Sequence, residues 1–422
     1  MGSPERIRNV AKRVAKWSRA GHQMVVVPSA MSGETNRLLT LAKELSPNGS
    51  SPELLRELDM IASTGEQVSV GLLAIALQAE GIQAVSYAGW QVPIKTDSAF
   101  TKARIQSIDD QRVRADLAAG KVVVITGFQG VDDNNNITTL GRGGSDTSAV
   151  AVAAALKADE CLIYTDVDGV YTTDPRIVPE ARRLSSISFE EMLEMASLGS
   201  KVLQTRSVSL AMKEGVRVQV LSSFIDENAP PADSIPGTMI VSDEELDRIL
   251  AESEEGQEME RQLITGIAAD KNEAKVTLTR VADRPGAVAA IFGPLAEANI
   301  NVDMIIQNVG RDKGETDVTF TVPSADLLRA QTLLEAQKEA IGFNRIITDA
   351  KVAKVSVVGV GMKSHAGVAA TMFRAMADRG INIQAISTSE IKVSVLIDED
   401  ETELAVRVLH SAYGLDADDA AA

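Results

Sequence analysis

The stretch TTLGRGGSDTSAVAVAAALKA, from Thr138 to Ala158, indicates how this chain folds. A β-branched pair leads into a loop with three glycines, and small apolar residues at helical spacing follow. Such a strand–loop–helix unit can bind an anion with its backbone amides and the helix N-terminus. It is not a Walker A loop, because no Gly-Lys-Ser/Thr follows, and Asp146 stands where a dinucleotide fingerprint needs glycine. The loop therefore either binds an anion, helped by the charge of Arg142, or is a plain turn before a helix capped by Asp146 or Thr147.

Strand-like and helix-like segments alternate around this loop, from residue 1 to about residue 240. Longer segments of helical period, such as Val68–Ala79 and Ser148–Ala158, separate short β-branched runs bounded by Gly or Asp. Strands alternating with helices predict a largely parallel sheet with both faces covered. The strand-like runs are HQMVVVPSA (22–30), GIQAVSYAG (81–89), GKVVVITGFQG (120–130), DECLIYTDVDG (159–169) and GVRVQVLSS (215–223).

Composition excludes several classes of protein. The 422 residues are enough for roughly two to four domains. A net charge of −17 argues against general nucleic-acid binding and against adsorption to anionic membranes. The single cysteine, Cys161, lies in an apolar run, which predicts a buried thiol in a reducing cytoplasm and excludes a disulfide framework. The N-terminus lacks the apolar region of a signal peptide, and we expect no stretch of membrane-spanning length.

The last third of the chain contains an internal repeat. DRPGAVAAIFGPLAEANINVDMI begins at Asp283, and SHAGVAATMFRAMADRGINIQAI begins at Ser364, an offset of 81 (364 − 283). A constant offset through a whole helix and into a strand indicates a duplicated module, here a small α+β unit. The acidic segment 242–262 before the repeats reads as a connector. The expected boundaries are 1–240 for the first domain, 241–262 for the linker, 263–345 and 350–415 for the two modules, and 416–422 for the tail.

Three further polar stretches could carry chemistry. PSAMSGETN (28–36) follows a predicted strand, STGEQ (63–67) matches a capping box, and YTDVDGVYTTDPR (164–176) offers oxygen ligands of the kind an Mg²⁺-nucleotide site needs. Each alone is explained as a polar loop or a helix cap. Three of the four motifs, however, lie just beyond predicted strands, and parallel strands bring such ends to one edge of the sheet.

The motifs SAMSGETN, STGEQ, TTLGRGGSDT, YTDVDGVYTTDPR and EMASLGSKVL, in this order, resemble the aspartate kinase family. The repeated modules resemble its ACT regulatory domains. The resemblance implies an amino-acid-kinase (carbamate-kinase-like) α/β/α sandwich followed by two α+β ferredoxin-like ACT domains. It also implies transfer of a phosphoryl group from ATP, with Mg²⁺, to L-aspartate, the first step of lysine, threonine and methionine (diaminopimelate) biosynthesis. Only three histidines occur, but a carboxylate nucleophile is already ionised at pH 7 and needs no base.

The resemblance also implies roles for the residues that match the family motifs. Arg142 and Asp146 would be catalytic, and Glu66 would suit the α-ammonium group of the substrate. The implied substrate-binding residues are Thr35, Glu66, Arg142 and Ser145. The implied nucleotide-binding residues are Ser29, Thr165, Asp166, Tyr171, Arg176 and Lys201, with no separate metal site. The implied effector-binding residues are Asp283, Val288, Asn301, Asp303, Gln307, Asn382, Ile383 and Ser389.

One family motif has no counterpart in the chain. The family carries Lys-Phe-Gly-Gly-Thr-Ser on its first strand, where the lysine is the principal contact to the transferring phosphate, ahead of a stretch like Val-Gly-Ser-Pro-Glu-Arg-Ile. This chain begins MGSPERI. Either a GTG valine codon is read as the initiator Met1, or the chain is a true short form without activity. We expect the first, because a sheet that lacks a strand exposes ladder groups and loss of one donor costs roughly 10²–10³ in rate.

Two readings of the whole chain follow. One is an aspartate kinase that lysine, threonine or both inhibit, assembled through its ACT domains as a homodimer or an α2β2 complex. The other is a catalytically inactive, truncated or regulatory subunit that binds lysine or threonine. The resemblance disfavours a kinase for another small acid such as glutamate. Met259 is a candidate start for a separate regulatory subunit.

Overall fold

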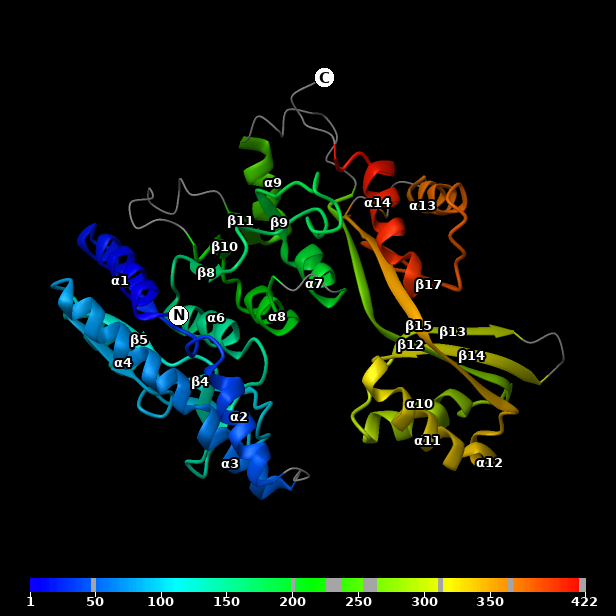
Figure 1. The fold of residues 1–422 in the computed structure, drawn as a ribbon, viewed down its shortest axis with the longest axis horizontal. Coiled ribbons are helices and arrows are strands. Elements are labelled where there is room, and N and C mark those ends of the chain that lie inside the picture. Colours follow the sequence, from blue (N-terminus) through cyan, green and yellow to red (C-terminus); the bar gives the residue numbers. More distant parts are fainter. Residues whose placement is uncertain are drawn as a thin grey trace. The chain divides into compact units, whose positions relative to one another are not determined.

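The computed structural model describes residues 1–46, 51–198, 202–224, 237–252, 264–309, 314–360, 362 and 367–416. The chain divides into two units (Figure 1). The N-terminal unit comprises Met1–Val170, Leu184–Leu193 and Lys201–Glu252. The C-terminal unit comprises Tyr171–Arg183, Glu194–Ser200 and Ser253–Ala422. Two short segments from the first half of the chain thus belong to the C-terminal unit.

Three sheets form the N-terminal unit, and all five predicted strand runs are confirmed as strands. The run around Val25 forms only a two-residue strand, which pairs with β5 in the described part of the chain. The first sheet is parallel, with order β1 (Val25–Val26), β5 (Val122–Ile125), β2 (Ala84–Tyr87). The second has order β8 (Cys161–Thr165), β10 (Val218–Ser222), β11 (Thr238–Val241), β9 (Ser186–Ser188). The third has order β4 (Ile105–Ile108), β3 (Ile94–Thr96), β6 (Gln129–Val131), β7 (Ile137–Thr139).

Helices cover both faces of the parallel sheet, as the alternation of strands and helices predicts. Successive residues of a strand point to opposite faces, so Val122 and Val124 pack against α1 and α4. Val123 and Ile125 pack with residues of α5 and α6 instead. The helices are α1 (Pro4–Arg19), α2 (Glu34–Leu45), α3 (Pro52–Ala62), α4 (Thr64–Ala79), α5 (Gln111–Ala118), α6 (Gly144–Leu156), α7 (Phe189–Ser197), α8 (Thr205–Glu214) and α9 (Asp243–Glu252).

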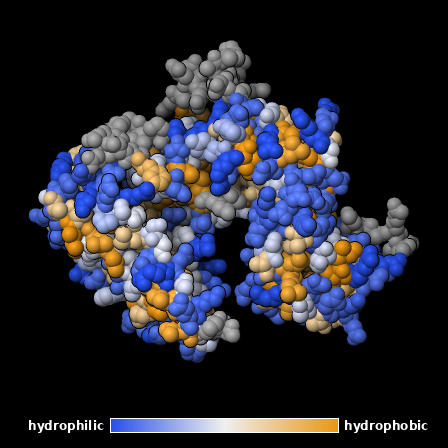
Figure 2. All heavy atoms as spheres, viewed as in Figure 1, coloured by the Kyte–Doolittle hydropathy of each residue, from blue (hydrophilic) through white to orange (hydrophobic). Residues whose placement is uncertain are grey.

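The continuous helical stretch Glu53–Ala79 corrects one expectation from the sequence. Within the described residues it is long and apolar enough, by length and composition, to cross a membrane. Half of its most apolar window is buried, and both Leu73 and Leu77 lie fully inside the core. The outer face of α4 is apolar too, and Figure 2 shows hydrophobic residues gathered over this helix. The packing of its inner face identifies α4 as a core helix of the N-terminal unit.

The acidic segment after β11 is not a bare connector throughout. Residues Asp243–Glu252 form α9, which buries Leu246 against the N-terminal unit. The remainder of the expected linker, and with it Met259, lies outside the described residues. The part of the acidic segment that the structure describes therefore belongs to the first unit.

A six-stranded sheet in the C-terminal unit joins the two repeated modules. Its order is β13 (Asp303–Val309), β14 (Glu315–Val322), β12 (Gly266–Ala282), β15 (Arg345–Val358), β17 (Lys392–Asp398), β16 (Ala385–Thr388). The helices are α10 (Ala287–Glu297), α11 (Leu327–Ala336), α12 (Lys338–Ile341), α13 (Val368–Ala377) and α14 (Thr402–Ala412), with short 3-10 helices at Ser324–Asp326 and Glu399–Glu401. Helices α10 and α13 begin 81 residues apart (368 − 287), which confirms the repeat.

The two long strands run through both modules. The start of β12, Gly266–Asp270, pairs with the end of β15 and completes the second module. The later part of β12, from Ala274, pairs with β14 and with the start of β15 in the first module. In chain order, one strand of the second module therefore precedes the whole of the first module.

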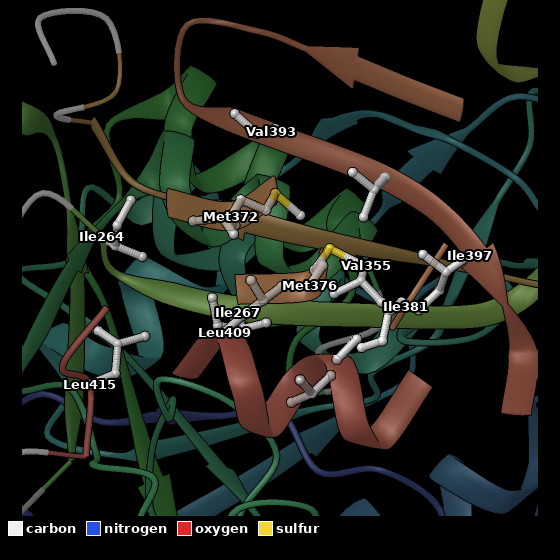
Figure 3. Packing of buried hydrophobic residues seen from close by; sticks show 14 of the residues in the cluster. Ile264, Ile267, Val355, Met372, Met376, Ile381, Val393, Ile397, Leu409 and Leu415 are labelled. Carbon is white, nitrogen blue, oxygen red and sulfur yellow. The ribbon is translucent and has the colours of Figure 1, made fainter. Parts of the chain in front are cut away.

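Each module has its own core. In the second module, Met372 and Met376 of α13 and Leu409 of α14 pack on the sheet residues Val355 and Ile397 (Figure 3). The first module buries Ile291, Leu295 and Leu334 against Val276 and Phe320. Met304 of β13 and Ala385 of β16 share a small third cluster, so the outermost strands of the sheet approach one another.

A buried ion pair links the two modules near this approach. The ammonium group of Lys354 on β15 lies 2.7 Å from Oε1 of Glu273 and 2.6 Å from Oδ2 of Asp303. The side chains of Lys354 and Glu273 are almost fully buried, whereas Asp303 is half exposed. Burial by itself would raise the pKa of Asp303, but the hydrogen bond and charge of Lys354 hold it below its ordinary value. The same contacts raise the pKa of Lys354, so Lys354 and Asp303 are ionised together at neutral pH.

We expect the Lys354→Met substitution to lower the free energy of unfolding by about 3–5 kcal/mol, because it leaves Glu273 buried and uncompensated. Urea denaturation followed by circular dichroism measures the loss. The double variant with Glu273→Leu should recover most of it, since an apolar pair replaces the ion pair. A loss below about 1 kcal/mol in the single variant would contradict the prediction.

Candidate functional site

The glycine loop of the opening stretch joins β7 to α6. Gly141 and Gly143 have φ angles of 81° and 68°, a backbone region that L-residues with side chains rarely adopt. A Cβ atom on Gly143 would lie 1.9 Å from Cγ of Gln204. The alternative of a helix capped by Asp146 or Thr147 is wrong, because Gly143 is the N-cap residue and no side chain caps the helix there. The N–H of Gly144 donates to the carbonyl oxygen of Gly141 at 3.0 Å, and no side chain caps the other amides of the first turn of α6.

A Gly143→Ala substitution should lower the free energy of unfolding by about 1–3 kcal/mol, because it combines a strained φ angle with a clash against Gln204. Thermal unfolding measures the effect. Gly120→Ala is the matched control, because Gly120 has a φ angle of 77° and open space around the added Cβ. Equal losses in the two variants would show that close packing of the loop contributes nothing.

Two positioning residues near the loop have no motif in the sequence. Asp59 of α3 is 1% exposed and accepts hydrogen bonds from the backbone N–H and the hydroxyl of Thr139, just before the loop. Arg206 donates through Nη1 to the carbonyl oxygen of Leu140 at 2.8 Å. The position of Asp59 between the apolar residues Leu58 and Met60 of α3 is the sequence feature that could have indicated it. Both residues fix the end of β7 from which the glycine loop starts.

Glu66 lies one turn into α4 with its side chain buried. Oε1 accepts a hydrogen bond of 3.1 Å from the backbone N–H of Ala30, whereas Oε2 is buried without a hydrogen-bond partner among the described residues. Burial raises the pKa of Glu66 to about 7. The predicted capping box is wrong, because Ser63 makes no side-chain cap and its hydroxyl donates to the carbonyl oxygen of Met60. Glu66 instead binds the loop 28–36, with one oxygen left for a further donor.

Gly65 allows this contact between α4 and the loop 28–36. A Cβ atom on Gly65 would lie 2.9 Å from Cβ of Ala30. Thr35 occupies the first turn of α2, which begins at the end of the same loop. The structure therefore brings the SAMSGETN and STGEQ motifs together.

A cavity of about 1010 Å³ in the N-terminal unit separates β1 from β8. Each of these strands is at the edge of its sheet, and both line the cavity, as do α1 and α6. Met1 also lines it. The side chains of Ser29, Ser145 and Asp146 face the same space. The described unit therefore has a space between two strand edges that apolar residues line together with polar residues of three motifs.

Burial shapes the chemistry of the groups around this cavity. It raises the pKa of Asp146 to about 6. It also raises the pKa of Cys161 to about 12, with a smaller contribution from the Asp146 carboxylate. The prediction of a buried, unpaired thiol at Cys161 is confirmed. A thiol with such a pKa is protonated at pH 7 and is a packing residue rather than a nucleophile.

The remaining predicted nucleotide residues divide between the units. Thr165 ends β8, and its hydroxyl donates to Oδ1 of Asp166 at 3.2 Å. Tyr171 and Arg176 belong to the C-terminal unit, where Arg176 pairs with Asp174 at 2.7 Å. Lys201 lies outside the described residues. Arg142 is exposed in the glycine loop.

The predicted effector residues of the C-terminal unit fall into three places. Thr321 of β14 pairs with both Asp303 of β13 and Lys275 of β12, so Asp303 and Lys275 lie at the same level of the sheet. Asp283 lies just after β12, eight residues beyond Lys275 (283 − 275), which is roughly 26 Å along the strand. Val288, in the first turn of α10, lies near the Asp283 end. Asn301 precedes Asp303 at the start of the edge strand β13, while Gln307 lies further along β13. Asn382 and Ile383 precede β16 and Ser389 follows it.

Hydrogen bonds between the two modules bring some of these effector residues close to one another. Nζ of Lys275 hydrogen-bonds to the side-chain oxygen of Gln384, next to Ile383. Lys354 binds Asp303 at the same level of the sheet. The structure therefore brings the segments around Asp303 and Ile383 together, and it leaves Asp283 and Ser389 at distant positions.

Comparison with known proteins identifies related chains along the full length. The model of the amino acid kinase family matches residues 1–222, and models of the ACT domain match residues 275–342 and 355–413. Aspartate kinase from Pseudomonas fluorescens is 58% identical over 417 residues, covering 99% of this chain and 96% of the relative. Escherichia coli aspartokinase III in complex with aspartate and ADP has a TM-score of 0.75 at 26% identity, covering 95% of this chain and 96% of that structure. The same enzyme in complex with lysine and aspartate has a TM-score of 0.66 at 26% identity, covering 96% of each chain.

Proposed function

The chain belongs to the aspartate kinases of the amino acid kinase family, and on this premise we propose that it phosphorylates L-aspartate with ATP at the entry to lysine, threonine and methionine biosynthesis. The product would be 4-phospho-L-aspartate, on the diaminopimelate route. The observation that best supports this proposal is the buried carboxylate of Glu66, whose Oε2 has no partner among the described residues. An amino-acid ammonium group is the donor that such an oxygen would take. We further propose a cytoplasmic location.

We assign aspartate binding to residues of the two contacting motifs and the glycine loop. Glu66 would bind the α-ammonium group, and Thr35 would lie beside it at the start of α2. Arg142 and Ser145 would hold the carboxylates, Arg142 by charge and Ser145 from the first turn of α6. The γ-carboxylate of aspartate is already ionised, so the protein would position it and neutralise charge rather than remove a proton. Arg142 and Asp146 would act at the transfer site.

Nucleotide binding would draw on Ser29 and on the segment after β8. The α6 N-terminus and the amides of the glycine loop suit a phosphate. The proposed contacts are Ser29, Thr165, Asp166, Tyr171, Arg176 and Lys201. Mg²⁺ would accompany ATP and neutralise phosphate charge, and the carboxylates of Asp146 and Asp166 are hard oxygen donors that fit this ion. As limits along the sequence we propose 1–240 for the catalytic domain, 241–262 for the linker, 263–345 and 350–415 for the ACT domains, and 416–422 for the tail. Within these limits α9 of the linker belongs to the N-terminal unit, and residues 171–183 belong to the C-terminal unit.

The first experiment is an assay for aspartate-dependent acyl phosphate. The 422-residue chain is incubated with MgATP and L-aspartate, and hydroxylamine traps the product as the hydroxamate. The proposal expects trapped product with aspartate and none with glutamate. Lysine binding to a chain that shows no turnover would instead support the alternative of a regulatory subunit. Turnover with glutamate at the same rate would contradict the proposed substrate.

We propose that lysine, threonine or both inhibit the enzyme through the ACT modules. The support is that a structural neighbour was solved with lysine bound, and that β13 and β16 bring the two modules together in this chain. Central residues of the proposed site are Asn301, Asp303, Asn382 and Ile383. Asp283, Val288, Gln307 and Ser389 lie further away along the sheet, so we propose that an ACT-mediated homodimer or α2β2 assembly brings them to an effector.

Replacing Gln307 with alanine is expected to weaken feedback inhibition while sparing turnover. Gln307 is exposed on β13, so its loss removes an effector contact without opening the core. Titration of the hydroxamate assay with lysine and threonine measures the inhibition midpoint, which should rise about tenfold. Thr319→Ala, one strand away, is the control. Equal loss of turnover and inhibition would remove Gln307 from the site.

A further inference from the structure

The segment Tyr171–Arg183, called the tether hairpin here, leaves the N-terminal unit and folds with the second ACT module. Its two arms pair through the backbone, with the N–H of Thr172 donating to the carbonyl oxygen of Arg182 at 2.9 Å. Val178 and Ala181 are buried in the core of the second module, among residues of α13, α14 and the sheet. The tether hairpin is therefore part of that core although more than 80 residues separate it from the start of β12.

Two backbone contacts join the tether hairpin to β12. The N–H of Ile267 donates to the carbonyl oxygen of Thr172 at 2.7 Å. A Cβ atom on the neighbouring Gly266 would lie 2.6 Å from the same oxygen. Only glycine at that position permits the approach. The hairpin is thus joined to the first strand of the second module, not merely packed against it.

The side chain of Thr172 makes the deepest polar contact of the tether hairpin. Its hydroxyl lies 2.9 Å from Nε2 of His410 on α14, and it also accepts a hydrogen bond of 3.1 Å from the N–H of Arg182. Thr172 is 1% exposed and His410 is fully buried. A buried hydroxyl–imidazole pair costs free energy to separate, because neither group can turn to water. The orientation of the hairpin on the second module therefore depends on this pair.

Resting on the proposed function, we infer that Thr172 and His410 are positioning residues for nucleotide binding. They would fix the tether hairpin, which carries Tyr171 and Arg176, on the second ACT module. The side chain of Arg176 is 86% exposed, and two hydrogen bonds from its guanidinium group to the carboxylate of Asp174 orient it within the hairpin. A shift of α14 would move the Thr172 anchor and, through a short covalent path, both nucleotide contacts. The anchor connects a regulatory helix to the nucleotide residues within one folded unit.

The test compares Thr172→Val, which removes the hydroxyl, with Thr172→Ser, which keeps it. Isothermal titration calorimetry of the full chain measures the dissociation constant for MgADP and, as a second ligand, the dissociation constant for L-aspartate. We expect Thr172→Val to weaken MgADP about tenfold, with aspartate affinity unchanged and Thr172→Ser close to wild type. Hydrogen exchange should rise in residues 171–183 of Thr172→Val only.

A double-mutant cycle guards against a general folding defect. His410→Leu should weaken MgADP as much as Thr172→Val, the double variant should be no weaker, and His410→Gln should retain affinity because its amide can reach the hydroxyl. Faster exchange in the hairpin with unchanged MgADP affinity would overturn the positioning role alone. Absence of MgADP binding to the wild-type chain would overturn the proposed function as well.

Discussion

Extending the chain before Met1 with a strand that bears the Lys-Phe-Gly-Gly-Thr-Ser motif is expected to raise aspartate-dependent turnover by roughly 10²–10³-fold. The physical reason is the cavity between β1 and β8. Among the described residues each strand has no partner on the side of the cavity, and α1 and α6 supply apolar walls. One more strand in this space would join the sheet that contains β1 to the sheet that contains β8. Its end would lie beside Ser29 and Asp146, where a lysine can reach a transferring phosphate.

A control distinguishes the effect of pairing an added strand from the effect of the lysine charge. An extension with the lysine replaced by alanine should fill the cavity and raise the melting temperature, yet leave turnover near that of the 422-residue chain. The hydroxamate assay and thermal unfolding are measured on the same three proteins. Equal turnover with either extension would show that the lysine is dispensable. Equal melting temperatures for all three would show that the cavity is not a strand site.

The Glu66→Gln substitution is expected to raise the KM for aspartate about a hundredfold, with less than a threefold change in the KM for ATP. The amide keeps the size of the side chain, and only the carboxylate charge that would bind the α-ammonium group is lost; removal of one partner of a buried charge pair costs about 2–5 kcal/mol. Steady-state kinetics by the hydroxamate assay measures both constants. Glu57→Gln, on an exposed side chain of α3, is the matched control. An unchanged KM for aspartate would remove Glu66 from the substrate site.

The raised pKa of Glu66 predicts that the kcat/KM for aspartate depends on pH. Burial raises the pKa of Glu66 to about 7, so the free enzyme must lose a proton before it can bind an ammonium group. The kcat/KM for aspartate should therefore fall as the pH drops below about 7, and aspartate binding between pH 6 and pH 7 should release protons to the buffer. In Glu66→Gln both effects should disappear. Proton release that persists in the variant would assign it to another group, such as Asp146.

A rise in pH has the opposite effect on the stability of the ligand-free protein: it strengthens aspartate binding but lowers stability. The folded state holds the Glu66 proton more tightly than the unfolded chain, whose glutamates titrate near 4.5. Ionisation of Glu66 therefore lowers the stability of the ligand-free protein as the pH rises from about 4.5 to about 7. The Glu66→Gln variant should be more stable than wild type at pH 8, and the difference should shrink toward pH 5.

Sequence patterns predict the fold where local and long-range forces agree. The continuous apolar run of β5 indicates a strand buried on both faces, and the 81-residue repeat indicates two ACT modules. The pattern around Ser63 misled for a physical reason. A capping box is a local arrangement, but Glu66 finds its hydrogen bond in the loop 28–36, which only the tertiary fold brings close. The spacing of residues within one motif cannot show that a distant loop competes with a local cap for the Glu66 side chain.

Other parts of the site carry no local pattern. Asp59 and Arg206 brace the glycine loop from helices that are far apart in the chain. The motif YTDVDGVYTTDPR reads as one continuous loop, yet the chain assigns Thr165 to one unit and Tyr171 to the other. Residues of one sequence motif can therefore respond to different folded units, and no spacing rule predicts where that division falls.

The tether hairpin also has a consequence for biosynthesis of the chain. Thr172 and His410 are separated by 238 residues, and α14 is the last helix of the described chain. At roughly 5–20 residues per second, a ribosome needs about 12–50 s to travel from one partner to the other. During that interval the hairpin and the start of β12 have emerged without the helix that completes their core. The second ACT module therefore matures last, and nascent chains that stop before α14 should expose the hairpin to proteases.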